Sequence, residues 1–280
     1  MIGIIGGSGL YAMADLQEPH WRRVETPYGA PSDDLLFGRL NGLEVVFLPR
    51  HGRNHRLLPS EINYRANIYA LKLVGVRRLV SVSAVGSLRE AIVPGHLVVV
   101  DQFVDRTRGR VSTFFGDGIV AHVSLAEPVC ADLANRLTEA VERAHGTVHR
   151  GGTYLGMDGP QFSTKAESHL YRAWGMDVIG MTNATESKLA REAGVCYATL
   201  AMSTDYDCWH EEAGAVEATD ILAVLHANVE LAQRVVKELV CDALLPRPCA
   251  CATACATALL TPRDVIPPER LAALEVILAP

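Results

Sequence analysis

Short apolar runs alternate along the chain with longer amphipathic segments. The runs are rich in Val, Ile and Leu, and they predict strands at Met1–Ile5, Glu44–Leu48, Arg78–Ser83, Leu97–Phe103, Val178–Met181 and Cys196–Met202. Between them, apolar residues recur every three or four positions, which predicts helices at Ser60–Val74, Glu127–Ala144, Thr164–Trp174, Thr185–Ala193 and Thr219–Val240. The alternation predicts a single α/β domain in which helices flank a mixed, twisted β-sheet.

The pattern changes near residue 242. Residues 243–280 are rich in Pro and Cys, and the stretch "PPERLAALEVIL" predicts a short helix with Pro268 near its first turn. No Gly/Ser-rich or Pro-rich linker divides the chain before this point. We therefore interpret residues 1–242 as the main domain and residues 243–280 as a C-terminal extension of the same domain.

Composition excludes several classes of protein. The net charge of −6 argues against a general nucleic-acid binder, because phosphate contacts along a strand require an excess of Lys and Arg. No stretch of eighteen apolar residues free of charge predicts a membrane span, and the start "MIGIIGGSGL" is a strand and turn, not a signal peptide. These features predict a cytoplasmic protein.

Seven cysteines are present, and a cytoplasmic setting predicts buried thiols for most of them. Three lie close together in the tail segment "CACATAC", as Cys249, Cys251 and Cys255. Because no second Cys pair or His follows this segment, we predict no metal site and interpret the tail cysteines as structural or redox-labile thiols.

Anion-binding groups recur where predicted strands end. Ser8 lies in the glycine turn "GIIGGSGL", Arg50 and His51 follow the second strand, and Ser83 with Ala84 and then Thr182 follow later strands. Arg offers a fork that matches phosphate oxygens, His and hydroxyl groups add donors, and small residues let backbone N–H groups approach. Because ligands of α/β sheets collect at the carboxyl ends of strands, these residues predict a phosphate site.

The glycine turn has two other interpretations. Gly7 and Gly9 fit the start of a dinucleotide-binding fingerprint, which would make the chain a non-catalytic nucleotide-binding or NAD-binding domain. However, the residues after Gly9 predict no helix to receive a pyrophosphate. The turn also fits a tight connection without any ligand.

The stretch "LAMSTDYDCW" places Asp205 and Asp207 directly after an apolar strand. If the chain stays extended there, both carboxylates leave the same face, and their mutual repulsion favours a proton on one of them. Such a pair is suited to general acid catalysis. A solvated turn with Asp as a helix N-cap is the alternative.

Eight longer motifs resemble the trimeric purine nucleoside phosphorylases, and within them most closely the 5′-methylthioadenosine phosphorylases. These motifs run in family order over residues 1–240: "GIIGGSGL", "TPYGAPSD", "RHGRNHRLLPSEINYRANIYALK", "SAVGSLRE", "PGHLVVVDQFVDRT", "DGPQFSTKAES", "WGMDVIGMTNATE" and "AMSTDYDCW". The resemblance implies a purine nucleoside phosphorylase-like fold and phosphate-dependent cleavage of a purine nucleoside. It requires no metal or organic cofactor, since inorganic phosphate is a co-substrate.

The resemblance also implies roles for individual residues. Asp205 would protonate N7 of the departing base with Asp207 as its partner, and phosphate would bind Ser8, Arg50, His51, Ser83, Ala84 and Thr182. Base and ribose would contact Phe162, Ser163 and Met181. The 5′ pocket would comprise Ala218 and Ile221 together with His122, which a neighbouring subunit of a homotrimer would contribute.

Two residues bear on which purine is cleaved. Family members that prefer inosine and guanosine carry Asn at the position of Asp205 and Glu at that of Ser163, so both departures favour 6-aminopurines. The resemblance therefore implies cleavage of 5′-methylthioadenosine to adenine and 5-methylthioribose 1-phosphate. Because Ala218 is small, a broader specificity that includes adenosine, inosine or methylthioinosine is the alternative.

Overall fold

The sheet is organised around one long strand, β5 (Arg78–Ser87). In the computed structural model, which describes residues 1–7, 9–210, 218–244, 246 and 249–279, β5 pairs in parallel with β1 (Ile2–Gly6) and β11 (Cys196–Asp205). Near its end it pairs antiparallel with β10 (Val178–Gly180). Its ten residues let different partners share its length, so the sheet branches at this strand.

The described residues form an eleven-stranded sheet, and its mixture of parallel and antiparallel pairs confirms the predicted mixed sheet. Its main path runs β2-β3-β4-β1-β5-β10-β9-β7, while β11 joins β5 to β6 and β8. The remaining strands are β2 (Gln17–Arg22), β3 (Leu35–Leu40), β4 (Leu43–Pro49), β6 (Leu97–Val100), β7 (Gln102–Asp105), β8 (Val148–Arg150) and β9 (Thr153–Gly156). The helices are α1 (Tyr64–Leu73), α2 (Ala131–Arg143), α3 (Lys165–Ala173), α4 (Asn183–Glu192), α5 (Ala218–Val240) and α6 (Pro268–Leu278), with short 3₁₀ turns at Cys241–Leu244, Cys251–Thr253 and Arg263–Val265.

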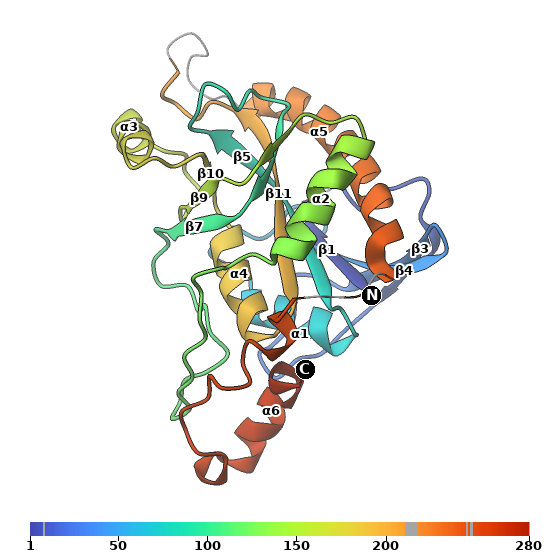
Figure 1. Cartoon of the computed structure of the whole chain (residues 1–280), viewed down its shortest axis with the longest axis vertical. Coiled ribbons are helices and arrows are strands. Elements are labelled where there is room, and N and C mark those ends of the chain that lie inside the picture. The colour runs from blue at the N-terminus through green and yellow to red at the C-terminus, as the bar shows by residue number, and fades with distance from the viewer. Residues whose placement is uncertain (8, 211–217, 245, 247–248, 280) are drawn as a thin grey trace.

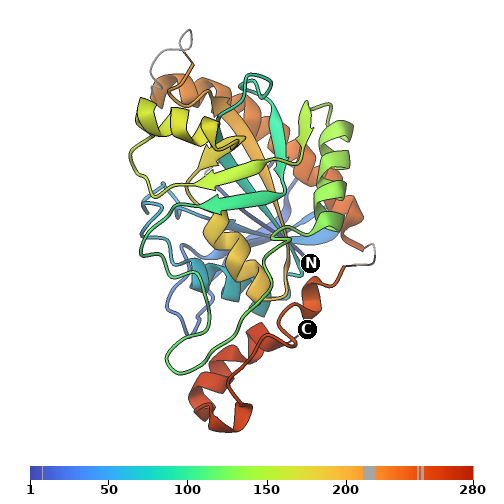
Figure 2. The same ribbon diagram turned by 60° about the vertical axis from the view of Figure 1, so that its left-hand side comes forward.

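Helices cover both faces of the sheet (Figures 1 and 2). Apolar side chains of α2 and α5 join one buried cluster with Ile2 and Ile4 of β1. Side chains of α1, α4 and α6 join a second cluster with Ile5. Because successive side chains of a strand point to opposite faces, one strand supplies both clusters. The result is a three-layer arrangement.

Helix boundaries depend on local capping. Asn63, not the predicted Ser60, caps α1, because its side chain accepts a hydrogen bond from the Ala66 N–H. Thr164 and Glu167 form a capping box at the start of α3. None of the helices in the described ranges is long and apolar enough to cross a membrane, and this includes the 23-residue α5.

The sequence analysis did not predict four of the strands, and it predicted two others as one continuous strand. The segment predicted as Leu97–Phe103 divides into β6 and β7, which pair with different neighbours. The edge strand β2 is exposed at every position and therefore has no apolar pattern. β3 contains Gly38, where a side chain would collide with Leu16, and β8 and β9 are only three and four residues long.

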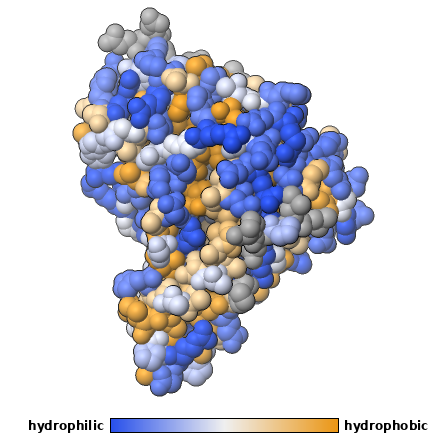
Figure 3. Space-filling view, in the orientation of Figure 1, coloured by the Kyte–Doolittle hydropathy of each residue, from blue (hydrophilic) through white to orange (hydrophobic). Residues whose placement is uncertain are grey.

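The C-terminal extension packs on the face that carries α1 and α4. Leu274 and Ile277 of α6 are buried in the second cluster. The buried Lys72 of α1 donates hydrogen bonds to the carbonyls of Ala193 and Ile277, 2.5 and 3.1 Å away, and to a third at Ala279. Hydrophobic residues also gather on the surface of this lower part of the molecule (Figure 3). Within the extension, Leu260 and Val265 are exposed.

Replacing Lys72 with methionine tests how firmly the extension is held. Lys72→Met leaves buried carbonyls without their charged donor, so the free energy of unfolding should fall by about 3 kcal/mol. Chemical denaturation measures this change. Lys237→Met, which breaks an exposed ion pair with Asp15, is the matched control and should leave stability nearly unchanged. Equal stability of both variants would contradict a structural role for Lys72.

Candidate active site

A cavity of about 530 Å³ opens where the parallel strands β1, β4, β5 and β11 end. Carboxyl ends of parallel strands are the expected place for a ligand in this class of fold. The lining includes nine residues that the sequence singled out: Arg50, His51, Ser83, Ala84, Phe162, Met181, Thr182, Asp205 and Asp207. The fold therefore brings together residues from five separate segments of the chain.

The other sequence-predicted residues stand apart from this lining. Ser163 lies beside the cavity, where its hydroxyl donates to the Met157 sulfur across 3.9 Å. His122 is exposed on a loop whose backbone pairs with the C-terminal extension. Ser8 and the side chains of Ala218 and Ile221 fall outside the described residues.

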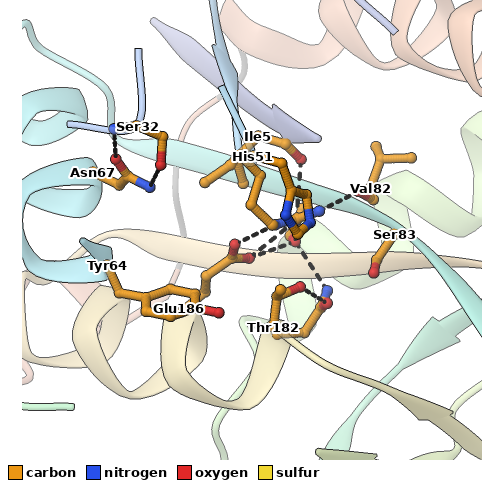
Figure 4. Close-up of polar contacts among 12 residues, drawn as sticks. Ile5, Ser32, His51, Tyr64, Asn67, Val82, Ser83, Thr182 and Glu186 are labelled. Atoms are coloured by element: carbon orange, nitrogen blue, oxygen red, sulfur yellow. Dashed lines mark hydrogen bonds and ion pairs between the residues drawn. The ribbon is translucent and has the colours of Figure 1, made fainter. Parts of the chain in front are cut away.

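Arg50 is almost completely buried, and its hydrogen bonds connect several segments that line the cavity or lie beneath it. Its Nε lies 2.5 Å from one carboxylate oxygen of Glu186, and its Nη2 lies 3.2 Å from the other. Further hydrogen bonds reach the carbonyl of Val82 and the hydroxyl of Ser81. Figure 4 shows Glu186, Val82, His51, Ser83 and Thr182 arranged around this cluster.

The charge of Arg50 is stable despite its burial. Burial opposes the charge, but the Glu186 carboxylate outweighs it and raises the pKa of Arg50. Its Nε and Nη2 are occupied by Glu186 and Ser81, whereas Nη1 bonds only the Val82 carbonyl. One N–H of the guanidinium is therefore left for a ligand.

Glu186 is the main residue that the sequence analysis did not assign to the site. It is fully buried on α4 and also accepts hydrogen bonds from the Ser81 and Tyr197 hydroxyls, at 2.6 and 3.1 Å. A single Glu in the first turn of a helix is ordinary in sequence, and its neighbours Thr185 and Ser187 are polar, so no sequence signal marked it as buried.

His51 differs from its expected role as a donor. Its Nδ1 lies 2.8 Å from the Leu57 carbonyl, which can only accept, so Nδ1 carries the hydrogen. Burial, aided by nearby Arg50, lowers the pKa of His51 to about 4. The ring is therefore neutral at pH 7, and its Nε2 is an acceptor. It can accept a hydrogen bond from a protonated phosphate oxygen.

Ser83 and Thr182 complete the polar end of the cavity. Both are largely buried and line the cavity, Ser83 from β5 and Thr182 from the N-cap of α4. Thr182 makes no side-chain capping bond, and its own N–H donates to the Tyr154 hydroxyl at 3.3 Å, so α4 begins at this end of the cavity. Helix N-termini favour anions, and this end of the cavity is therefore electropositive.

Asp205 is partly buried at the opposite end of the lining. Its Oδ1 accepts the Asp207 N–H at 2.8 Å, and its Oδ2 accepts the Thr204 hydroxyl at 2.7 Å. Burial is the largest cause that raises the pKa of Asp205, and the Asp207 charge adds a smaller effect in the same direction. Desolvation thus matters more here than the like-charge repulsion on which the sequence argument relied.

Asp207 does not continue the strand as the sequence argument assumed. β11 ends at Asp205, and Asp207 adopts a left-handed conformation with a φ of 51°. Its Oδ2 is buried and has no hydrogen-bond partner of ordinary geometry among the described residues. Burial raises the pKa of Asp207, and this effect exceeds the opposing influence of the Ser168 and Ser163 hydroxyls. The solvated-turn interpretation is therefore wrong for both aspartates.

The Thr204 hydroxyl can adapt to a change in the protonation state of Asp205. Its single hydroxyl hydrogen has two acceptors, Asp205 Oδ2 at 2.7 Å and the Val85 carbonyl at 3.2 Å. It donates to Asp205 when that carboxylate is ionised and can turn to Val85 when Asp205 carries a proton. The same site therefore accommodates both protonation states of Asp205.

The strand register fixes the separation of the two polar ends. In the pairing of β5 with β11, Ser83 lies opposite Ala201 and Gly86 lies opposite Asp205. Three strand residues span about 10 Å, so the anion-binding end and the carboxyl pair are separated by roughly the length of a pentose and part of a base. Gly86 leaves no room for a side chain, because an added Cβ would lie 3.0 Å from Asp205 Oδ1.

Arg110 is a second residue that the sequence analysis missed. Its side chain is buried and donates hydrogen bonds to the carbonyls of Met181 and Asp158, and it pairs with the Asp158 carboxylate. These bonds tie the segment before Phe162 to the end of β10. Arg110 acts as a positioning residue for the apolar wall of the cavity. One Arg in a loop gives no sequence signal for such a role.

The dinucleotide-binding interpretation of the glycine turn requires a helix directly after the turn, and the next described element is a strand. The first described secondary structure after the glycine turn is β2, which pairs antiparallel with β3. A pyrophosphate site of that kind needs a helix directly after the turn. The turn therefore serves the cavity, which Gly7 and Leu10 line.

Comparison with known proteins gives a consistent family. The model of the Phosphorylase superfamily matches residues 1–240. An S-methyl-5′-thioadenosine phosphorylase of Geobacter sulfurreducens is 55% identical over 279 residues, which is 99% of this chain and 98% of that protein. A protein of the same name from Koribacter versatilis is also 55% identical and covers 99% of this chain and 95% of its own.

Solved structures agree with these sequence matches. A methylthioadenosine phosphorylase from an antarctic soil metagenomic library is 52% identical, with a TM-score of 0.95 over 99% of this chain and 98% of its own. The methylthioadenosine phosphorylase of Schistosoma mansoni, solved in complex with adenine, is 38% identical, with a TM-score of 0.80 over 86% of this chain and 90% of its own.

Glu186→Gln tests the buried ion pair under the cavity. The amide keeps the shape of the carboxylate but leaves the Arg50 charge uncompensated, so the free energy of unfolding should fall by about 3 kcal/mol or more. Denaturant titration measures the change. Glu238→Gln breaks an exposed pair with Arg143 and should have little effect. Wild-type stability of Glu186→Gln would show that the pair is dispensable.

Proposed function

The chain belongs to the phosphorylase superfamily, and on that premise we propose that it cleaves 5′-methylthioadenosine with inorganic phosphate. The products are adenine and 5-methylthioribose 1-phosphate. The observation that carries this proposal is a partly buried carboxyl group of raised pKa, Asp205, in the same cavity as the polar end that contains Arg50. The relatives at 50–55% identity that bear the name of this activity support it.

The reaction needs an acid where the base departs. A phosphate oxygen attacks C1′, the bond from C1′ to the purine nitrogen N9 breaks, and its electron pair moves into the purine ring. Transfer of a proton from Asp205 to N7 lets adenine leave as a neutral molecule. Burial keeps this proton on Asp205 at a higher pH than usual, and Thr204 can then donate to the Val85 carbonyl.

The opposite end of the cavity binds phosphate in this proposal. Arg50 Nη1, the Ser83 hydroxyl and the N-terminus of α4 at Thr182 donate hydrogen bonds. Neutral His51 accepts one from a protonated phosphate oxygen, which favours the form of phosphate that retains one hydrogen. Ser8 and the Ala84 backbone belong to the same proposed set. Inorganic phosphate is the co-substrate, and no metal or organic cofactor takes part in this chemistry.

The carboxyl pair also favours a 6-aminopurine. Asp205 can donate to N7 through one oxygen and accept from the 6-amino group through the other. Phe162 and Met181 line the cavity and supply apolar surface for the base and the ribose. A 6-oxopurine presents a carbonyl and an N1–H that this arrangement pairs less well, and each unpaired group costs about 1–3 kcal/mol. Ser163 supplies no carboxylate for that N1–H.

The proposal also includes the pocket for the 5′ group of the sugar and the oligomeric state of the protein. We assign the apolar residues Ala218 and Ile221, whose side chains lie outside the described residues, to the pocket for the methylthio group. We also propose that His122 contributes to the pocket of a neighbouring subunit in a homotrimer. The exposed apolar residues Val120 and Leu260, which lie beside His122, suit a subunit interface. Light scattering that finds only active monomers would exclude the shared site. We propose a cytoplasmic location.

A substrate panel tests the function. Methylthioadenosine, adenosine, inosine and methylthioinosine are assayed for base release with and without phosphate. Cleavage of the adenine nucleosides should require phosphate, and methylthioadenosine should have the highest kcat/KM. Inosine cleaved far faster than the adenine nucleosides would replace this proposal with the broader purine nucleoside phosphorylase activity.

Asp205→Asn should lower kcat on adenine nucleosides by about 10²–10⁴-fold. Its activity on 6-oxopurine nucleosides should fall much less. Because the acid must be protonated, wild-type kcat should fall as pH rises through the raised pKa of Asp205, and the variant should lack this limb. Asp264→Asn, in the extension, is the control. If Asp205→Asn retains full adenine-nucleoside activity, the acid is another group.

Ser83→Ala should raise the KM for phosphate about tenfold and leave the KM for the nucleoside nearly unchanged, because one hydrogen bond to a charged ligand is lost. Initial rates at varied phosphate measure this. Ser83→Thr keeps the hydroxyl and should stay near wild type. An unchanged phosphate KM in Ser83→Ala would remove Ser83 from the phosphate site. Arg50→Ala is a less selective probe, since it also leaves the buried Glu186 without its partner.

A further inference from the structure

Four cysteine sulfurs meet at one point of the fold, far from the cavity. They belong to Cys130, Cys196, Cys249 and Cys251, which we call the thiol cluster, and all four Sγ atoms lie within 4.8 Å of one another. The sulfurs of Cys196 and Cys249 lie 3.3 Å apart. Three of the four residues are buried and Cys249 is partly buried. Such a set of sulfurs is rare outside metal sites and disulfides.

The cluster joins segments that are distant in the sequence. Cys196 begins β11, Cys130 is the N-cap of α2, and the other two lie in the C-terminal extension. The extension returns to the lower end of β11 in Figure 1. There it approaches the backbone so closely that a side chain on Gly194 would lie 3.1 Å from the Ala252 carbonyl. The tail alone offers two ligands, and the fold supplies the other two.

We propose that the thiol cluster binds one Zn²⁺ ion as a structural site. Four thiolates at zinc–sulfur distances of about 2.3 Å form a tetrahedron whose sulfurs lie about 3.8 Å apart. In the cluster one sulfur–sulfur distance is 3.3 Å and none exceeds 4.8 Å, so this tetrahedron requires only small side-chain movements. A cluster of several irons with bridging sulfides needs more room between its thiolates.

Local charges suit a tetrathiolate site. Four thiolates around a divalent ion carry a net charge of −2, and Arg191 Nη1 lies 3.8 Å from the Cys251 sulfur. Cys130 makes no capping hydrogen bond through its side chain, yet its position at the start of α2 puts its sulfur by the positive end of the helix. Both features stabilise negative charge on sulfur, in a region otherwise packed with apolar side chains.

The site would hold the protein together and take no part in catalysis. All four ligands come from the chain, so no position stays open for a substrate or water. Cys196 and Asp205 begin and end the same ten-residue strand, about 30 Å apart. Zinc would therefore fix the extension to β11 and α2 without touching the cavity. This inference is independent of the proposed nucleoside substrate.

The test uses the full-length protein purified under reducing conditions without chelator. Elemental analysis should find about one zinc per chain. Removal with a chelator should lower the thermal midpoint, and added Zn²⁺ should restore it. Co²⁺ added to the metal-free protein should give the intense thiolate charge-transfer and tetrahedral ligand-field absorption, which Zn²⁺ then removes.

Single replacements assign the ligands. Cys249→Ser should lose the metal and the cobalt spectrum. Cys255→Ser, also in the extension but outside the cluster, and Cys241→Ser, at the surface, should retain both. If a ligand variant fails to fold, the spectrum and the metal content of the wild-type protein still decide the question.

Three results would overturn the proposal. The first is a reduced wild-type protein that contains no zinc and binds neither Zn²⁺ nor Co²⁺. The second is an intact mass, measured under denaturing conditions on freshly isolated protein, that shows disulfides among the cluster cysteines. The third is iron as the metal present, with its visible absorption. Unchanged kcat in the metal-free protein would agree with a structural site.

Discussion

The buried ion pair between Arg50 and Glu186 is the interaction on which the rest of the site depends. Arg50 follows β4, Glu186 lies on α4, and the guanidinium also bonds Ser81 and Val82 of β5. Three elements are therefore fixed relative to one another through one side chain. Two charges buried alone would be costly, but here nearly every donor and acceptor is satisfied within the protein. The one guanidinium N–H that remains is available at the cavity, so the same charge pair stabilises the fold and prepares an anion site.

The opposite end of the cavity uses burial in a different way. Among the described residues no cation forms an ion pair with Asp205 or Asp207, and burial raises the pKa of both carboxyl groups. One end of the cavity thus favours an anion, while the other favours a proton on a carboxyl group. This division matches a reaction in which phosphate enters at one end and a base departs with a proton at the other. The register of β5 against β11 sets the distance between these two functions.

The C-terminal extension shows how the end of the chain can complete the core. Lys72 donates to one carbonyl at the end of α4 and to two at the end of α6, and the thiol cluster gathers sulfurs from the extension, the N-cap of α2 and β11. A sequence argument that searched for ligands only near the tail predicted no metal site. Cys130 and Cys196 lie well upstream, and no spacing rule connects them to Cys251. Their meeting follows from the path of the extension across the end of the sheet.

The sequence by itself determined the α/β class, most helices and central strands, and the polar residues at the two ends of the cavity. Apolar periodicity and the position of polar residues after strands are local signals, because a short stretch of sequence is enough to recognise each of them. The tertiary structure alone decided the exposed edge strand β2, the break between β6 and β7, the burial of Glu186 and the acceptor role of His51. It also decided that desolvation is the leading cause that raises the pKa of Asp205. Each of these depends on which distant groups exclude water from a side chain or share a hydrogen with it, and that information exists only once the chain has folded.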